Sequence, residues 1–333
     1  MTTLDVSLSQ SPRSLKRLSH SLREIIANLF PPAWLWLASL LLIAFDIYAI
    51  HFGHKFLIDD RKLWLLVIYP LVVFPIAWWL SRGGNANSFM SRPLRLFMMP
   101  AYLMPTMSAL AVFGYLVMAN NAPLADAQLA EWDKMLGLNW FAYVDFVNQH
   151  LWLNWAMFHA YKYMIQALLI IIAAAIVEGH PDRAAELIAL TFATALTTLA
   201  IGSHFPSISA MAFLADDNIR AMFPGEMSSI TTQELYEVRG SIPKLIDPTH
   251  TEGITQFPSF HTICGILTVY GARGAWWRFW PACIFSTLLI AATPIYGCHY
   301  FVDLIAGAAV AGSFIGLSQL AKHARVNPLK IVA

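Results

Sequence analysis

A histidine and an aspartate stand four residues apart near the C-terminus, in Gly297-Cys298-His299-Tyr300-Phe301-Val302-Asp303, where a long apolar segment begins. On a helix this spacing places both side chains on one face, one turn apart. A carboxylate that enters a hydrophobic span is costly, so it needs a partner or a chemical task. The pair predicts an imidazole that Asp303 orients through one ring nitrogen, so that the other nitrogen can attack an electrophile.

A second histidine ends the sequence Phe257-Pro258-Ser259-Phe260-His261, which opens another apolar segment. His261 could protonate a leaving oxygen if its protonation state differs from that of His299. The electrophile is predicted to be a phosphate, because the preceding polar stretch carries Arg220, Arg239 and Lys244. Two other interpretations are a purely structural His–Asp pair and a metal site, for which zinc would need three or four tetrahedral ligands.

The composition indicates an integral membrane protein. Of 333 residues, 58% are hydrophobic and only 12% are charged, about half of the ~25% that is usual for soluble domains. The net charge of +1 argues against a nucleic-acid partner, which would need a clustered basic surface. Cys264, Cys283 and Cys298 lie in or beside apolar segments without a CxxC spacing, which favours small core residues over disulfides or metal ligands.

The apolar segments predict an all-α, polytopic membrane helix bundle of about eight helices, since about 20 residues cross the hydrocarbon core. The expected spans are 33–51, 62–80, 94–119, 151–177, 185–213, 257–272, 276–296 and 298–321. We divide the chain into a basic N-terminal segment (1–32), two additional transmembrane helices (33–93), a six-helix core (94–321) and a cytoplasmic tail (322–333). The segment 1–32 has apolar residues at helical spacing opposite basic ones, which fits either an amphipathic helix on an anionic membrane surface or a partly disordered tail.

The basic residues predict the orientation of the bundle. Lysine and arginine collect in the N-terminal segment, the 81–95 and 272–278 connections and the C-terminal tail, and all four fall on one side if there are eight spans. The positive-inside rule makes that side cytoplasmic. The long connections 120–150 and 214–256 then lie on the opposite face together with His261 and His299. The site is therefore expected to face the periplasm, the extracellular space or an organelle lumen.

The two histidine segments resemble the type-2 phosphatidic acid phosphatase superfamily, whose second and third motifs read PSGH and SRxxxxxHxxxD. The HYFVD sequence at 299–303 is most similar to the branch that contains fungal inositol phosphorylceramide synthase. The resemblance implies that His299 attacks phosphorus to give a phosphohistidine, that Asp303 orients it and that His261 is the acid. It also implies a reaction without metal or other cofactor.

The chain departs from the family pattern around the phosphate. The Ser-Arg of the third motif falls on Ala292 and Thr293, and Phe260 replaces the glycine of the second motif. The first motif, KxxxxxxRP, is missing, and we interpret Arg92-Pro93 as a chance match on the cytoplasmic side. If this chain binds phosphate, another residue must therefore replace the arginine that binds it in the family.

Several residues are candidates for binding the substrate phosphate. Lys162 lies in a polar patch, His159–Gln166, well inside the fourth span, where a lysine costs roughly 2.5 to 3.5 kcal/mol and so predicts a polar cavity. The full set of candidates is Arg239, Arg220, Lys162, Ser259, Tyr300 and His204.

The expected function is a metal-independent phosphotransferase that acts on a lipid phosphate or phospholipid headgroup, with an alcohol as acceptor. With water as the acceptor the same chemistry is a lipid phosphate phosphatase. An alternative of another class is a lipid transporter or flippase with Lys162 and the histidines near its substrate path. That alternative predicts an internal repeat with broken helices in matching halves, which the sequence does not show.

Overall fold

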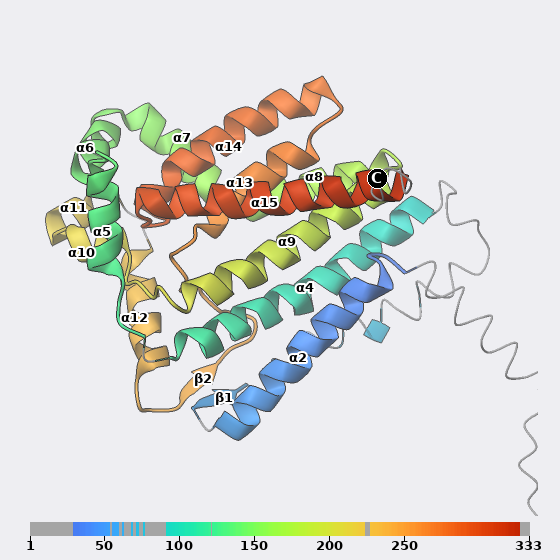
Figure 1. Ribbon diagram of the computed structural model, residues 1–333, viewed down its shortest axis with the longest axis horizontal. Coiled ribbons are helices and arrows are strands. Elements are labelled where there is room, and N and C mark those ends of the chain that lie inside the picture. The colour runs from blue at the N-terminus through green and yellow to red at the C-terminus, as the bar shows by residue number, and fades with distance from the viewer. Residues whose placement is uncertain are drawn as a thin grey trace, which may run out of the picture.

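The structure is a computed structural model that describes residues 29–53, 55–59, 91–120, 122–223 and 227–326 and the single positions 62, 68, 71, 72 and 76. Nearly all of the N-terminal segment 1–32, most of the expected second span and the end of the tail lie outside the described residues. Within the described part the chain is an all-α membrane helix bundle with thirteen helices and two short strands (Figure 1).

Long helices form the bundle, and short ones lie across one end of it (Figure 1). The bundle helices are α2 (Ala33–Gly53), α4 (Ser91–Met118), α7 (Leu151–Lys162), α8 (Met164–Val177), α9 (Pro181–Gly202), α13 (Phe260–Gly271), α14 (Trp276–Tyr296) and α15 (Phe301–Val326). The short elements are β1 (Phe56–Ile58), α5 (Asp126–Met135), α6 (Trp140–Gln149), α10 (Ala210–Leu214), α11 (Asp217–Ala221), α12 (Ser228–Arg239) and β2 (Lys244–Ile246). The two strands pair in parallel, with Phe56 opposite Lys244.

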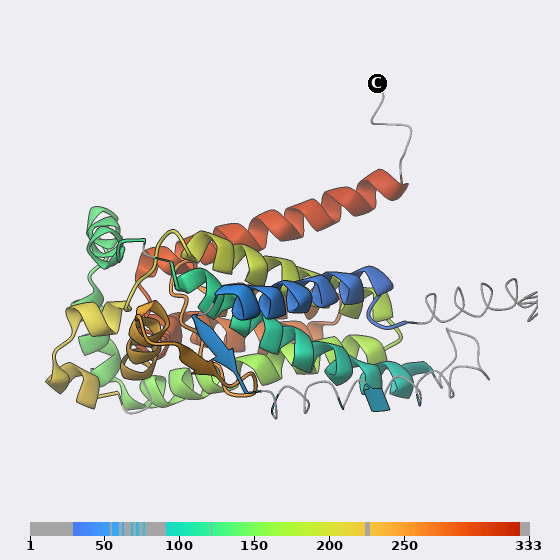
Figure 2. The same cartoon turned by 90° about the horizontal axis from the view of Figure 1, so that it is seen from below.

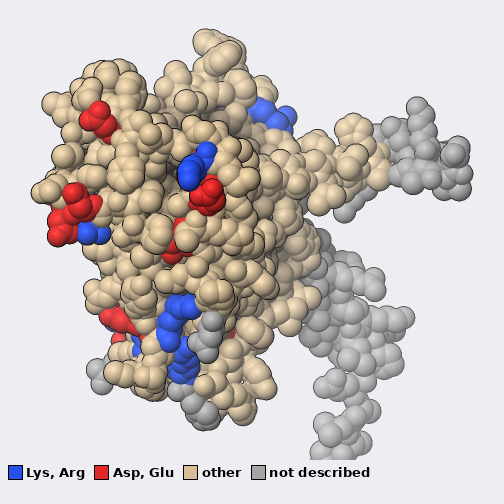
Figure 3. Space-filling view, turned by 60° about the vertical axis from the view of Figure 1, so that its left-hand side comes forward, with Lys and Arg blue, Asp and Glu red and all other residues tan. Residues whose placement is uncertain are grey.

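Five of the described helices, α2, α4, α9, α14 and α15, are long and apolar enough to cross a membrane. The helices α7 and α8 make a sixth span if the pair is counted as one. Helix α15 diverges from its neighbours towards its C-terminal end (Figure 2). The surface seen towards the end with the short helices is largely uncharged, with acidic and basic side chains in small groups (Figure 3).

Three expected spans differ from the observed helices. The fourth, 151–177, is broken at Tyr163 and bent by 59°, inside the polar patch, where Lys162 and Tyr163 are exposed. The fifth begins at Pro181, which suits the first turn of a helix, and ends at Gly202, shortly before Pro206, instead of reaching 213. The sixth, α13, has only 12 residues, about 18 Å of helix, which is less than the roughly 30 Å of the hydrocarbon core.

Helix α13 lies at the centre of the bundle, in contact with α8, α9, α14 and α15. Its side chains Ile263, Cys264 and Leu267 are fully buried. Cys264, Cys283 and Cys298 are all free thiols. A short, fully enclosed helix of this kind fixes the position of its own first residues, which include His261.

Ionic contacts tie the helices together at the end away from the short helices. Glu186 on α9 accepts hydrogen bonds from Arg273 at 2.8 Å, Tyr270 at 2.7 Å and Ser318 at 2.6 Å. Lys322 of α15 also pairs with Glu186, at 2.6 Å. This buried carboxylate therefore connects α9, the end of α13 and α15.

We expect Glu186→Ala to lower the free energy of unfolding by about 3 kcal/mol, because removal of one partner leaves buried or half-buried charges without compensation. Thermal or denaturant unfolding of the full chain in one detergent measures the change. The matched control is Glu131→Ala, which removes an exposed carboxylate that lies 3.6 Å from Lys134 and should cost less than about 1 kcal/mol. Equal losses in the two variants would contradict the role given to Glu186.

Candidate active site

His299 and Asp303 form the contact that their spacing predicts. His299 lies in the connection between α14 and α15, and its Nδ1 is 3.1 Å from Oδ2 of Asp303. The same carboxylate oxygen accepts the backbone N–H of Tyr300 at 2.9 Å. Only 2% of His299 and 0% of Asp303 is exposed. Because Nδ1 is engaged by the carboxylate, attack on an electrophile would fall to Nε2.

Burial sets the protonation state of His299. Burial lowers the pKa of this imidazole to about 3. A hydrogen bond with the backbone of Gln256 has the opposite, smaller effect, because it favours the protonated form. A group with this pKa is neutral near pH 7, and the neutral imidazole is the form that can act as a nucleophile.

The beginning of α15 is held by a carboxylate from α5. Asp133 accepts the backbone N–H groups of Phe301 at 2.9 Å and Val302 at 2.7 Å, which are among the first N–H groups of the helix and have no partner within it. Burial raises the pKa of the Asp133 carboxyl, while the two N–H groups favour its ionised form. Asp133 thus fixes the start of α15 two residues after His299.

A second carboxylate of α5 holds Tyr300. The hydroxyl of Tyr300 donates to Asp126 Oδ1 at 3.0 Å, and the same oxygen accepts the hydroxyl of Ser207 at 2.6 Å. The other oxygen of Asp126 accepts the backbone N–H of Ile208 at 3.1 Å. Helix α5 therefore holds the three residues that follow His299 and, through Asp126, ties Tyr300 to the connection that follows α9.

His261 comes to the same place from α13. Its ring centroid is 5.6 Å from that of His299, with the planes at 70°. On its other side the ring stacks on Tyr161 of α7, with centroids 4.6 Å apart. Neither Nδ1 of His261 nor Oδ1 of Asp303 has a hydrogen-bond partner among the described residues, although both atoms are buried.

The backbones of α13 and α15 touch at the level of the site. The N–H of Ser259 donates to the carbonyl of Asp303 at 2.9 Å, and the Ser259 hydroxyl caps α13 by accepting the N–H of Thr262 at 3.3 Å. A side chain at Gly307 would place its Cβ 2.4 Å from the Ser259 carbonyl oxygen. The close approach that sets the distance between the two histidines therefore requires glycine at 307.

The other candidates for phosphate binding are spread over the molecule. Ser259 and Tyr300 lie at the site, where their hydroxyls are engaged in the contacts described above. Arg220 pairs with Asp217 at 2.7 Å on α11. His204 is exposed and bonds to the Ala200 carbonyl at 3.0 Å, while exposed Lys162 lies over the Tyr163 ring at 5.7 Å.

Arg239 differs from these candidates, because one nitrogen of its guanidinium group is buried and has no hydrogen-bond partner among the described residues. Its Nη2 donates to the carbonyl of Ala122 at 2.5 Å, and its Nη1 is buried without a partner among the described residues. The chain beside Ala122 is tied to the end of α9, where Asn120 donates to the Ser203 carbonyl at 2.6 Å. At Gly202 an added Cβ would lie 2.3 Å from Thr255. Arg239 is thus linked through these contacts to the segment that precedes His261.

No Lys or Arg of the described residues forms a hydrogen bond or ion pair with His299, His261 or Asp303. Thr293, at the position of the motif arginine, is fully buried and donates to the Leu289 carbonyl at 2.8 Å. Arg92 donates to the Val177 carbonyl at 2.8 Å, at the other end of the bundle, as expected for a chance match. Among the described residues no three His, Cys, Asp or Glu side chains are arranged to hold a metal ion.

Sequence reasoning missed Tyr161, Asp133 and the backbone of Gln256 as parts of this site. Tyr161 belongs to the polar patch that drew attention to Lys162, and Asp133 to the acidic connection 120–150. Both residues lie in polar stretches within or beside apolar segments, and this was the one sign in the sequence that they could belong to a site. Nothing in the sequence indicated that Tyr161 and Gln256 contact the histidines or that Asp133 holds the start of α15.

A model of the PAP2 superfamily matches residues 127–317. The chain belongs to this superfamily. The match includes Asp133 of α5, whose carboxylate holds the start of α15, and both histidine segments. No curated protein matches the chain, and no solved structure does. The PAP2 superfamily generally comprises membrane phosphatases and phosphotransferases, and the neutral, buried imidazole beside a carboxylate suits that chemistry.

We expect Gly307→Ala to destabilise the protein although alanine favours a helix by about 1 kcal/mol, because its Cβ would force α15 away from the Ser259 carbonyl. The matched control is Gly312→Ala, one and a half turns further along α15, where an added Cβ meets nothing within 4 Å. Thermal unfolding should show a lower Tm for the first variant and an unchanged or higher Tm for the second. A Tm of Gly307→Ala at or above the wild-type value would contradict the close approach.

Proposed function

We propose that the chain is a membrane phosphotransferase that acts on a lipid phosphate or phospholipid headgroup through a phosphohistidine on His299. The observation that carries the proposal is the buried contact between His299 and Asp303, with the ring of His261 beside it. Membership of the PAP2 superfamily supports it, because phosphate esters are the substrates of that family.

The proposed reaction has two displacement steps at phosphorus. In the first, Nε2 of His299 attacks the phosphorus of the donor, and the bond to the leaving oxygen breaks while His261 gives that oxygen a proton. Asp303 stabilises the positive charge on the ring through Nδ1. In the second, His261 takes the proton of the acceptor hydroxyl, whose oxygen attacks the phosphohistidine and releases His299. No cofactor takes part in this scheme.

The acceptor distinguishes a transferase from a phosphatase. A phosphatase uses water, whereas a transferase must keep water out and admit an alcohol. Two features support the transferase: the motif arginine is replaced by Thr293, and the 299–303 sequence is most similar to the branch with inositol phosphorylceramide synthase. The burial of His299, beneath Tyr161 and His261, is a third. Hydrolysis is the alternative within the same family.

Arg239 is the residue we propose to bind the phosphate in place of the motif arginine. It has a buried Nη1 without a partner among the described residues, and its Nη2 donates to the Ala122 carbonyl, in a segment that is tied to the end of α9. Arg220 is engaged by Asp217, and Lys162 is exposed at the α7–α8 bend. A guanidinium is also the group best suited to hold two phosphate oxygens at once.

The remaining proposals concern orientation and organisation. We propose that the site faces the extracytoplasmic side and that both termini are cytoplasmic. The short helices and the histidines lie at one end of the bundle, whereas Arg183, Arg273, Arg278 and Lys322 lie at the other, which supports this orientation. The segment 94–321 would form the six-helix catalytic core and 33–93 an addition to it.

We expect wild-type protein incubated with phosphatidate labelled at phosphorus to form a phosphoenzyme that survives alkaline denaturation, and His299→Ala to form none. Asp303→Asn should lower turnover by about 10³- to 10⁴-fold, by analogy with the aspartate of serine-protease triads. The measurements are label retained on the denatured chain and steady-state turnover. Transport of lipid by protein that never becomes labelled would sink the proposal in favour of a transporter.

We expect Arg239→Ala to raise KM for the labelled donor by about tenfold or more, since a charge-assisted hydrogen bond to phosphate is lost, worth about 1.5 to 3 kcal/mol. Arg239→Lys should recover only part of this, because an ammonium cannot bind two oxygens in the same plane. Arg220→Ala is the matched control and should leave KM within twofold. If the two alanine variants behave alike, Arg239 does not bind the phosphate.

A further inference from the structure

A buried aspartate in α2 has no part in the chemistry proposed above. Asp46 is 4% exposed, and neither of its carboxylate oxygens has a hydrogen-bond partner among the described residues. Ser39 lies two turns earlier on the same face and is fully engaged, with bonds to Tyr102 at 3.0 Å and Thr106 at 3.1 Å. An ionisable side chain inside a membrane helix is costly, so an unpartnered one points to a ligand.

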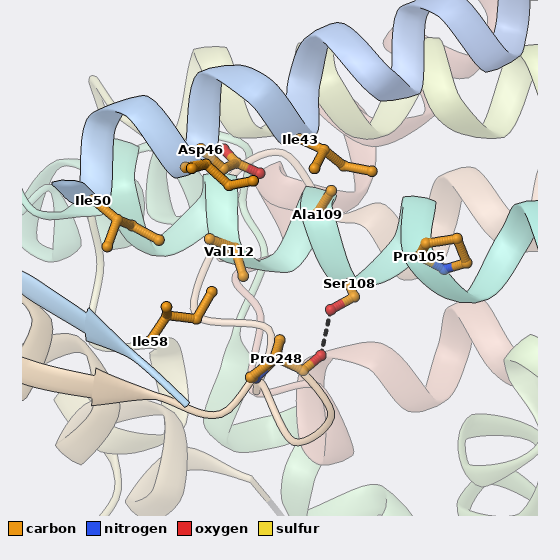
Figure 4. Close-up of a pocket in the computed structure, with 10 residues that line it drawn as sticks. Ile43, Asp46, Ile50, Ile58, Pro105, Ser108, Ala109, Val112 and Pro248 are labelled. Atoms are coloured by element: carbon orange, nitrogen blue, oxygen red, sulfur yellow. Dashed lines mark hydrogen bonds between the residues drawn. The ribbon is translucent and has the colours of Figure 1, made fainter. Parts of the chain in front are cut away.

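Asp46 faces a cavity of about 70 Å³ between α2 and α4 (Figure 4). Its walls are almost entirely aliphatic: Ile43, Ile47, Ile50, Ile58, Pro105, Ala109, Val112 and Pro248. The other polar lining residue, Ser108, already donates its hydroxyl to the carbonyl of Pro248. Among the residues that line this cavity, Asp46 is therefore the one whose polar atoms are available for a hydrogen bond to a ligand.

The cavity is reached from the membrane. Ile47 lines it and is also 50% exposed, on a helix whose outer side presents large apolar residues such as Leu41 and Phe45. Asp46 is seven residues before the end of α2 at Gly53, which places it about 10 Å along the helix from that end. Ile58 of β1 and Pro248 close the cavity towards the nearby surface. A molecule that enters must therefore be a lipid whose polar group can lie below the headgroup level.

We propose that this cavity binds the hydroxyl group of a lipid alcohol, such as a diacylglycerol, with its chains along α2 and α4. A carboxyl group can both accept from and donate to a hydroxyl when it is protonated, so the two groups satisfy one another without a net charge. A phosphate headgroup is excluded by its charge and its size, because the walls offer it no cation. A lipid amine would require two charges to be taken out of water in an aliphatic cavity.

This site is separate from His299, and its ligand belongs to the class of molecule that a phosphotransferase accepts or a phosphatase releases. That connection rests on the proposed function, but binding at Asp46 does not. The test can therefore use binding alone, with a ligand that has no phosphate, so that its failure leaves the proposed reaction untouched.

The experiment measures thermal unfolding of the full chain in lipid nanodiscs with 1,2-dioctanoylglycerol, its 3-O-methyl ether and a long-chain primary amine. We expect the alcohol to raise Tm and the methyl ether, which cannot donate a hydrogen bond, to have no effect. Asp46→Leu should weaken binding of the alcohol at least tenfold. This variant should itself fold, because it replaces an unpartnered carboxylate with an apolar side chain of similar size. Ser39→Ala, which does not line the cavity, is the matched control and should bind as wild type does.

Three results would overturn the proposal. The first is a Tm shift that is equal for the alcohol and its methyl ether. The second is binding that survives in Asp46→Leu. The third is binding of the amine but not of the alcohol, which would assign the cavity to a cationic lipid. If Asp46→Leu fails to fold, Asp46→Val decides the point: it removes both carboxyl oxygens with a smaller side chain, and it should bind the alcohol at least tenfold more weakly than wild type.

Discussion

The beginning of α15 is held by buried carboxylates, and the position of His299 depends on them. Asp303 engages the ring of His299 and the N–H of Tyr300, Asp133 takes the next two N–H groups, and Asp126 holds the Tyr300 hydroxyl. A helix N-terminus carries partial positive charge and unsatisfied donors, which favours negative groups at this point. In the reaction that we propose, the arrangement places three acidic groups where a phosphate would also approach, so the cations that bind it would have to come from elsewhere in the chain.

That constraint explains why the site needs helices that are far apart in the sequence. Helix α13 supplies His261 and contacts α15 through the backbone at Ser259 and Gly307. Helix α7 supplies Tyr161, whose ring covers His261, and it ends beside the bend at Tyr163. The break in the α7–α8 pair is thus at the same level as the histidines. A continuous span there would leave the polar patch within an apolar bundle.

The two ends of the bundle differ in how their polar groups are partnered. At one end Glu186 pairs with two cations, Arg273 after α13 and Lys322 of α15, and the contacts there are ionic. At the other end the polar groups of the site are buried, and several have no partner among the described residues. Buried groups without partners are costly, so their presence at the histidines and at Asp46 marks places where the chain gives up stability for binding. At the histidines the ligand that we propose carries a phosphate, and at Asp46 we infer an uncharged lipid.

The sequence by itself determined the class of fold, the apolar segments α2, α4, α14 and α15 to within a few residues, and the pairing of His299 with Asp303. These depend on local composition and on spacing within one helical turn, which the chain carries wherever it packs. Helix ends near proline and the short α13 were less well predicted, because hydropathy does not show where a helix stops within an apolar stretch. Only the tertiary structure decided that Tyr161 stacks on His261, that Asp133 caps α15 and that a buried guanidinium nitrogen of Arg239 has no partner among the described residues. Each of these contacts joins segments that are distant in the sequence, and the packing of the helices alone brings them together.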